Sequence, residues 1–210
     1  MAKKLFFTLS IIAFFASCGT RRTAVQVQDP ATFDEGVVIN GVRWATRNVD
    51  APGTFVESPE SSGMFFQWNR RKGWSEVGEL ENWDSSMPTG TEWYAENDPC
   101  PKGWRVPTAD ESRSLLLNTR HQWVSNWNNT GINGRIFGTA HNQIFLSAAG
   151  VRSGSDGSLD GAGLGGFHWS STQAGSENAW NLWFSPYGLF VAFVGNYWRT
   201  YGFSIRCVAK

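Results

Sequence analysis

Three cysteines and three histidines are the residues of this chain whose types most readily take part in chemistry. His121, His141 and His168 follow no spacing that is typical of metal ligands, and no order of serine, histidine and aspartate indicates a nucleophile with its base. Nothing in these patterns compels an enzymatic interpretation. We therefore expect no catalytic residue, no metal site and no cofactor.

The first cysteine follows what has the form of an export signal. Lys3 and Lys4 precede an almost wholly apolar run over 5–16, and small residues lead into Cys18. The run is shorter than the ~20 residues that a membrane-spanning helix needs. The order of these blocks resembles the lipobox of bacterial lipoproteins, in which the cysteine becomes the lipidated first residue. We expect a lipoprotein signal peptide over 1–17 and lipidation of Cys18; the alternative is an ordinary secretory signal.

The two remaining cysteines are Cys100 and Cys207. Two cysteines in an oxidising, extracytoplasmic compartment most often pair. The alternatives are two free buried thiols, or a metal site, which would need more ligands than two cysteines supply. We predict a disulfide, which closes a long loop and contributes ~4–5 kcal/mol in the chain-entropy model.

The segment around Cys100 stiffens the chain and starts a helix. Three prolines lie within Asp98–Thr108, and each proline fixes φ. Thr108 and Glu111 have the spacing of a capping box, in which each side chain accepts a hydrogen bond from the other residue's backbone N–H. We predict a helix from there to about Asn118, packed through its three consecutive leucines.

The rest of the chain predicts a single domain rich in strands and loops. Twelve tryptophans, 23 glycines and only 17% charged residues are typical of a rigid, loop-rich domain. We assign 18–36 to a flexible tether and 37–210 to the folded domain. Asn40-Gly41 predicts a tight hairpin turn before a strand over Val42–Asn48. Further strands are expected over 63–68, 122–124, 132–137, 144–146, 167–170, 179–185, 189–195 and 201–209, with turns at 186–188 and 195–196.

A long irregular stretch, 69–97, carries aromatic side chains among Gly, Glu, Ser and Pro. Loops of this length in a compact domain are usually functional or disordered, and the aromatics argue against disorder. Exposed aromatics beside polar residues stack on sugar rings or anchor a protein partner. The candidate ligand-binding residues are therefore Trp74, Trp83, Trp93 and Tyr94. The alternative is a small second core that holds the loop down.

The charge balance limits the partners. The chain has 18 basic and 18 acidic residues, and the expected signal peptide removes two lysines and no acid. A nucleic-acid partner requires clustered Lys and Arg. We therefore expect no nucleic acid as a partner.

Six blocks in fixed order resemble a known family: Asn40–Val49, Phe66–Asn69, Asp98–Thr108, Ile144–Arg152, Trp169–Thr172 and Gly202–Val208. They are similar to the Fibrobacter succinogenes major paralogous domain over residues 37–209. That family occurs in secreted and lipid-anchored proteins of Bacteroidetes and Fibrobacter. The resemblance implies an α+β, C-type-lectin-like fold with small antiparallel sheets, one or two flanking helices, long loops, and first and last strands side by side. Arg47 and Ser147 depart from the family's usual Cys and Pro.

Related folds bind sugar through calcium or carry out oxidase chemistry. The calcium-dependent lectins use Glu-Pro-Asn or Gln-Pro-Asp, and neither tripeptide occurs here. Two pairs of loop acids offer some of the oxygen ligands that calcium needs: Asp156 with Asp160, and Glu96 with Asp98. Neither pair follows a fixed ligand spacing, which favours solvated loop acids. The formylglycine-generating oxidases use a reactive cysteine pair, whereas the two cysteines here have stiff, apolar surroundings.

These patterns lead to one expected function and two alternatives. We expect a non-enzymatic binding module for a glycan or a protein partner, anchored by lipid in the cell envelope, at the outer membrane. The first alternative is a structural or adhesin-like envelope component. The second is a relative of the formylglycine-generating oxidases.

Overall fold

A computed structural model describes residues 28–117, 120–187 and 192–210. The expected signal peptide, the lipidation site Cys18 and the first part of the expected tether lie outside the described residues. The end of the expected turn at 186–188 and the start of the expected strand at 189 also lie outside them. Among the residues described, no helix is long and apolar enough to cross a membrane.

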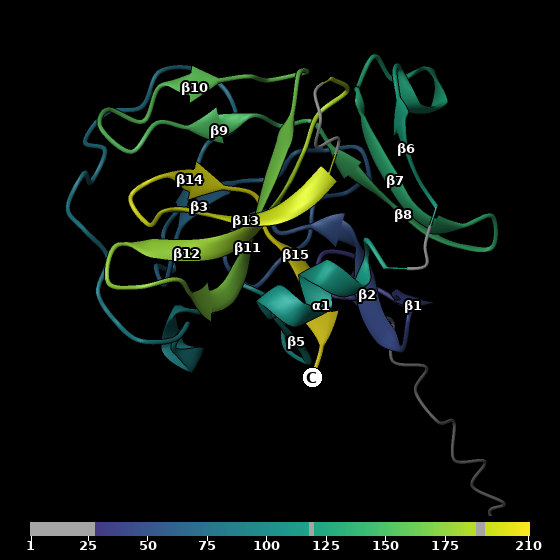
Figure 1. The fold of residues 1–210 in the computed structure, drawn as a ribbon, viewed down its shortest axis with the longest axis horizontal. Helices are drawn as coiled ribbons and strands as arrows, with labels where there is room; N and C mark the ends of the chain where they lie inside the picture. The colour runs from purple at the N-terminus through teal and green to yellow at the C-terminus, as the bar shows by residue number, and fades with distance from the viewer. Residues whose placement is uncertain (1–27, 118–119, 188–191) are drawn as a thin grey trace, which may run out of the picture.

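The described chain is mostly β, with small antiparallel sheets joined by long loops (Figure 1). One sheet has the order β1 (Val37–Ile39), β2 (Val42–Asn48), β15 (Arg206–Ala209) and β5 (Trp104–Arg105). A second has the order β10 (Leu159–Asp160), β9 (Val151–Arg152), β14 (Gly202–Phe203), β3 (Phe65–Gln67) and β4 (Gly73–Trp74). The other two are β11 (Gly166–Gln173), β12 (Asn178–Phe184) and β13 (Ala192–Trp198), and β6 (His121–Val124), β7 (Gly134–Thr139) and β8 (Asn142–Ser147).

Helical structure in the described residues is confined to one six-residue α-helix, α1 (Ala109–Ser114), and two single-turn 3₁₀ segments, Ala95–Asn97 and Trp127–Asn129. The predicted capping box is present, because Thr108 Oγ1 accepts from Glu111 N and Glu111 Oε2 accepts from Thr108 N. The predicted end near Asn118 is wrong. Past Ser114 the next three backbone N–H groups donate to carbonyls three residues back, and the Asn40 amide donates to the carbonyls of Ser114 and Leu117.

The last strand lies beside the N-terminal hairpin, as expected. β2 follows a hairpin turn in which Asn40 and Gly41 have φ of 50° and 81°, the left-handed conformation that a tight two-residue turn requires. β15 pairs antiparallel with β2 on one side and with β5 on the other. The chain end therefore lies in the middle of the sheet.

The expected single strand over 201–209 is wrong in detail, because it divides into β14 and β15 in different sheets. Side chains on both sides of this segment are buried. Ile205 and Cys207 are buried on one side, and Ser204 and Arg206 are buried on the other. Since the strand runs between packed layers, both of its faces are covered.

Arg206 is fully buried and bonds only to neutral acceptors among the described residues. Its guanidinium donates to Asn48 Oδ1 (2.9 Å), Ala45 O (3.1 Å) and Phe145 O (3.0 Å). Burial lowers the pKa of Arg206 to about 9, so the side chain remains charged at neutral pH. It joins β15 to β2 and β8, and loss of any of these acceptors would leave a buried charge partly unsatisfied.

The predicted disulfide is confirmed: Cys100 and Cys207 are bonded, with their Cα atoms 6.1 Å apart and a sequence separation of 107. It lies within a core cluster that contains Trp68, Trp104 and Trp169. The bond ties the loop before β5 to the neighbouring strand β15. A disulfide of this kind is typical of an oxidising, extracytoplasmic compartment.

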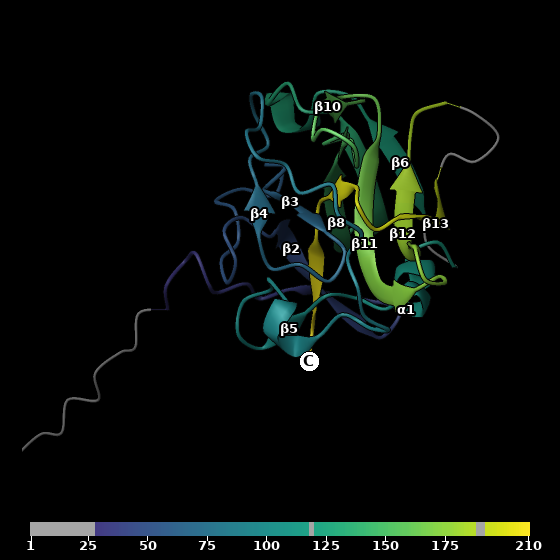
Figure 2. The same ribbon diagram turned by 90° about the vertical axis from the view of Figure 1, so that its left-hand side faces the viewer.

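The three-stranded sheet β11–β12–β13 stands along one side of the domain, and β13 is its outer strand (Figure 2). The turn predicted at Gly195-Asn196 is wrong, because both residues lie inside β13 and pair with Asn181 and Trp180 of β12. The seven-residue register between β12 and β13 overrides the local turn preference of Gly-Asn.

Part of the expected tether contacts the domain. Asp34 is buried and accepts hydrogen bonds from Thr46 and Arg47 of β2 and from the backbone N–H of Gly36. Packing against the domain therefore begins before Val37.

Removal of the disulfide tests how strongly it closes the chain. We expect the Cys100→Ala/Cys207→Ala variant to lose about 4–5 kcal/mol of unfolding free energy, because the unfolded chain regains the entropy of a long open loop. Urea unfolding under non-reducing conditions measures this difference. A variant with the midpoint and slope of the wild type would contradict a stabilising role.

His168 gives the fold a specific acid sensitivity. Its ring is fully buried and stacks on Phe184, and neither ring nitrogen has a partner among the described residues. Burial, and then the charge of Arg206, lower the pKa of His168 to about 3. The unfolded chain therefore binds this proton near pH 6.5 and the folded chain does not. The stabilisation is complete above pH 6.5 and is lost as the pH falls toward 3.

We expect the unfolding free energy to fall with decreasing pH by up to about 1.4 kcal/mol per unit more in the wild type than in His168→Leu. Urea unfolding at several pH values between 6.5 and 4 measures both slopes. His141→Leu is the matched control, because His141 is exposed. Equal slopes in the wild type and His168→Leu would contradict a neutral, buried imidazole.

Candidate ligand-binding site

The four aromatic residues expected to bind a ligand do not meet on one surface. Trp74 is buried in a small cluster with Phe65, and Trp83 packs on it with ring centroids 4.8 Å apart. Trp93 belongs to the larger core cluster and packs edge-on against Trp68. These contacts favour the alternative interpretation, a second small core beneath the loop.

The indole N–H groups of Trp83 and Trp93 also donate hydrogen bonds within the protein. Trp83 Nε1 donates to Gly154 O at 3.1 Å, and Trp93 Nε1 donates to Asn97 O at 3.0 Å. Tyr94 is half-buried and borders a hollow of about 350 Å³ that is mostly polar. As a ligand-binding set the four residues stay a prediction; the structure shows them as packing residues.

The loop acids considered as calcium ligands satisfy local backbone groups. Asp98 accepts from the backbone N–H groups of Cys100 and Val106, and Asp156 accepts from the backbone and hydroxyl of Ser158. No group of three or more His, Cys, Asp or Glu in the described ranges is placed to hold a metal ion. Of the expected site residues, Cys100 is joined to Cys207 and Trp74 packs against Trp83.

A different set of aromatics is open to solvent. Within the described chain, the tryptophan and tyrosine side chains that are exposed are Tyr187, Tyr197 and Trp198. Trp198 is 59% exposed, and Phe193 in the same strand is 37% exposed. All four residues lie on β13 or in the connection that leads from β12. Large aromatics normally bury most of their surface, so such a concentration is a candidate interaction site.

The pairing of β12 with β13 places these side chains. Trp183 lies opposite Phe193, Asn181 opposite Gly195, and Asn178 opposite Trp198. Directly opposite residues lie on the same face of an antiparallel pair. Trp183–Phe193 and Asn181–Gly195 therefore share one face of the sheet, and Asn178–Trp198 lies on the other, so rings and amides border both sides of β13.

One hollow, of about 190 Å³, lies over Gly195 and is bordered mainly by aromatic rings. A Cβ at Gly195 would come within 2.5 Å of the Phe193 ring, so glycine is what lets that ring lie over the strand. Trp183 and Phe193 meet edge to face with centroids 5.1 Å apart. The buried Asn181 amide donates to Gly195 O. This hollow is therefore almost wholly apolar.

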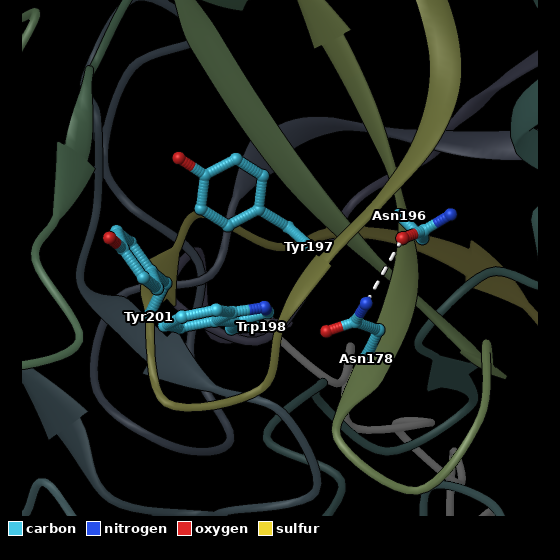
Figure 3. Close-up of a pocket in the computed structure, with 5 residues that line it drawn as sticks. All are labelled: Asn178, Asn196, Tyr197, Trp198 and Tyr201. Carbon is cyan, nitrogen blue, oxygen red and sulfur yellow. Dashed lines mark hydrogen bonds between the residues drawn. The ribbon is translucent and has the colours of Figure 1, made fainter.

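The adjacent hollow, of about 290 Å³, is bordered by Asn178, Asn196, Tyr197, Trp198 and Tyr201. Figure 3 shows these five residues around the end of β13, where an Asn178 Nδ2–Asn196 Oδ1 hydrogen bond of 3.2 Å joins the two amides. Tyr197 and Tyr201 pack edge to face, 4.7 Å between centroids.

The two hollows share Asn196 and Tyr197, so they adjoin along β13. We call this surface the aromatic site, and it consists of Phe167, Asn178, Asn181, Trp183, Phe193, Gly195, Asn196, Tyr197, Trp198 and Tyr201.

Arg199 fixes the end of the aromatic site. This buried side chain donates to the carbonyls of Asn178, Gly90 and Gly175, and its guanidinium lies 4.1 Å from the centroid of the Trp68 ring. It thereby holds the start of β12 against the end of β13. The ring of Trp198, one residue earlier, projects from a segment whose backbone is anchored on both sides.

The irregular stretch 69–97, which we call the aromatic loop, contacts the chain that carries this site. Trp83 lies under Gly202 and Gly157, where a Cβ would come within about 3 Å of its ring. Gly154, whose carbonyl Trp83 holds, lies equally close to the Tyr201 ring. The aromatic loop therefore positions the chain that carries Tyr201.

The side chains that border the aromatic site are neutral. None of the described residues that border the two hollows is charged. Burial, the neighbouring Tyr201 hydroxyl and the charge of Asp160 together raise the pKa of Tyr197. Tyr197 therefore remains a neutral phenol that can donate and accept hydrogen bonds at ordinary pH.

Comparison of the chain with family models, with curated proteins and with solved structures finds no match. The function must therefore be inferred from the geometry and chemistry of the site.

Sequence reasoning missed the aromatic site because Gly195-Asn196 has the local signature of a turn. A signal was nevertheless present. The segment 192–198 contains no charged residue, and aromatics occupy both alternating sets of positions, Phe193 and Tyr197 in one and Trp198 in the other. A strand with apolar residues on both faces at the edge of a sheet leaves one face without internal cover.

The Trp83→Ala/Trp93→Ala double variant distinguishes packing from binding in the aromatic loop. We expect a large loss of unfolding free energy, since replacing the buried Trp93 by alanine costs about 3–5 kcal/mol and replacing the partly buried Trp83 adds a smaller loss. Thermal and urea unfolding measure the loss. Unchanged stability together with lost ligand binding would contradict the packing assignment and restore the loop as the binding site.

Proposed function

We propose that this protein is a lipid-anchored, extracytoplasmic binding module that recognises a glycan through the aromatic site. The observation that carries the proposal is the solvent exposure of Phe193, Tyr197 and Trp198 beside asparagine amides on one sheet edge. Aromatic faces stack on the apolar faces of sugar rings, and amides exchange hydrogen bonds with sugar hydroxyls.

The form of the aromatic site suits a sugar better than a compact apolar ligand. Both hollows are shallow, and neutral donors and acceptors lie beside the rings. The backbone around Trp198 is anchored by Arg199, so little conformational freedom is lost when a ligand binds.

Location and anchoring rest on the N-terminal sequence and the disulfide. The lipobox-like order of residues before Cys18 supports attachment of the mature chain to a membrane by lipid. The Cys100–Cys207 bond supports an oxidising compartment. The pairing of β2 with β15 accords with the C-type-lectin-like architecture that we infer from the resemblance to the Fibrobacter succinogenes major paralogous domain.

The oxidase alternative is not favoured by the state of the cysteines. Its chemistry requires reactive thiols, and Cys100 and Cys207 are joined to each other in the core. We therefore propose binding without catalysis.

A protein ligand is the second candidate, and the edge position of β13 favours it. In the described part of the chain β13 pairs only with β12, and its residues carry no charge or proline. Such an edge accepts an added strand from another protein. Strand addition uses the backbone of β13, whereas glycan stacking uses its aromatic rings.

A glycan array with the full-length protein in detergent tests the glycan proposal. We expect binding to a subset of glycans and about tenfold weaker binding for Trp198→Ala, a loss of about 1.4 kcal/mol from one stacking contact. Phe33→Ala is the matched control, because Phe33 is 39% exposed and lies outside the aromatic site. Binding that is equal in Trp198→Ala and the wild type would contradict the location of the site.

A further inference from the structure

The size of the two hollows indicates how much ligand the aromatic site holds. Their volumes are about 290 Å³ and 190 Å³, and each is below the ~300 Å³ at which pockets begin to enclose a drug-sized ligand. Tyr197 borders both hollows. A ligand that uses the whole surface must therefore extend across Tyr197 from one hollow to the other.

The two hollows differ in chemistry. The one over Gly195 presents the rings of Phe167, Trp183 and Phe193, and suits an apolar ring face. The other presents the amides of Asn178 and Asn196 beside its rings, and suits hydroxyl groups. A chain of polyhydroxylated rings offers both features in every unit.

The Asn178 amide is incompletely satisfied. Its Nδ2 donates to Asn196 Oδ1, but its Oδ1 is buried and has no partner among the described residues. An unfilled buried acceptor is costly. A small turn of the amide toward a ligand hydroxyl would supply the missing donor.

The charges around the aromatic site disfavour an anionic ligand. The charge of Asp160 reaches Tyr197, and the exposed Glu177 directly precedes Asn178. The cation nearest in sequence, Arg199, is turned inward and donates to Asn178 O, Gly90 O, Gly175 O and Gln173 Oε1. A carboxylate or sulfate in either hollow would meet repulsion without a free cation to pair with.

We propose that the aromatic site binds a neutral glycan chain of at least two sugar units that crosses Tyr197, with one unit in each hollow, and that it rejects acidic sugars. This inference rests on the proposed glycan-binding function and specifies its ligand.

The test uses the full-length protein in detergent and isothermal titration with oligosaccharides of one to four units. The probes are homo-oligomers of glucose, mannose, galactose and xylose, with oligomers of galacturonic acid as the acidic comparison. We expect affinity for at least one neutral series to rise tenfold or more from one unit to two. We expect galacturonic acid oligomers to bind at least tenfold more weakly than neutral ones of equal length.

Variants assign each unit to its hollow. Phe193→Ala and Trp198→Ala each remove one exposed side chain, one from each hollow, and each is expected to abolish the rise from one unit to two. Phe33→Ala is expected to keep it. Asp160→Asn is expected to leave neutral binding unchanged and to strengthen galacturonate binding several-fold. Thermal unfolding of every variant checks that the fold is intact.

The outcomes separate the two proposals. Equal affinity for one and two units, or galacturonate binding as tight as neutral binding, overturns this inference while glycan binding itself stands. Absence of binding to every glycan of the array and to every probe overturns the proposed function and this inference with it.

Discussion

The placement of β15 is the constraint on which the rest of the structure depends. The last strand of the chain lies between β2 and β5, with Cys207 bonded to Cys100. Its neighbour Arg206 is buried among carbonyls of β2 and β8. A buried guanidinium without a carboxylate partner is stable only where the surrounding backbone supplies its acceptors. The native position of the chain end therefore depends on contacts with strands from the beginning and the middle of the chain.

Buried arginines also bond to backbone carbonyls where loops take the place of regular secondary structure. Arg152 and Arg199 are buried, and both donate mainly to backbone carbonyls of distant loops. Loop carbonyls that lack strand partners need donors when they are buried, and a guanidinium supplies several in a fixed plane. Arg199 links this role to function, because it anchors the strand ends that carry Asn178 and Trp198. The protein thus holds the proposed binding surface rigid with few helices and short strands.

The sequence predicts features that depend on neighbours along the chain or on compartment, and it fails where packing between distant segments decides. The Asn40-Gly41 turn, the Thr108 capping box and the cysteine pair needed only local geometry or an oxidising environment. The path of the chain through Gly195 depended on pairing with β12, which local turn preference cannot show. The sequence also does not show which aromatic side chains are exposed to solvent. A tryptophan in polar sequence, such as Trp93, is buried here, whereas Trp198 is open.

The central proposal is that Trp183 of β12 and Trp198 of β13, and not the tryptophans of the aromatic loop, contact a glycan ligand. The chain has twelve tryptophans, and each indole N–H gives its own nitrogen–proton NMR signal that single substitutions assign. Titration with the tightest-binding neutral oligosaccharide is the most direct measurement. The account predicts that the signals of Trp183 and Trp198 shift with ligand while those of Trp74 and Trp93 stay in place. Shifts confined to Trp74, Trp83 and Trp93 would contradict it.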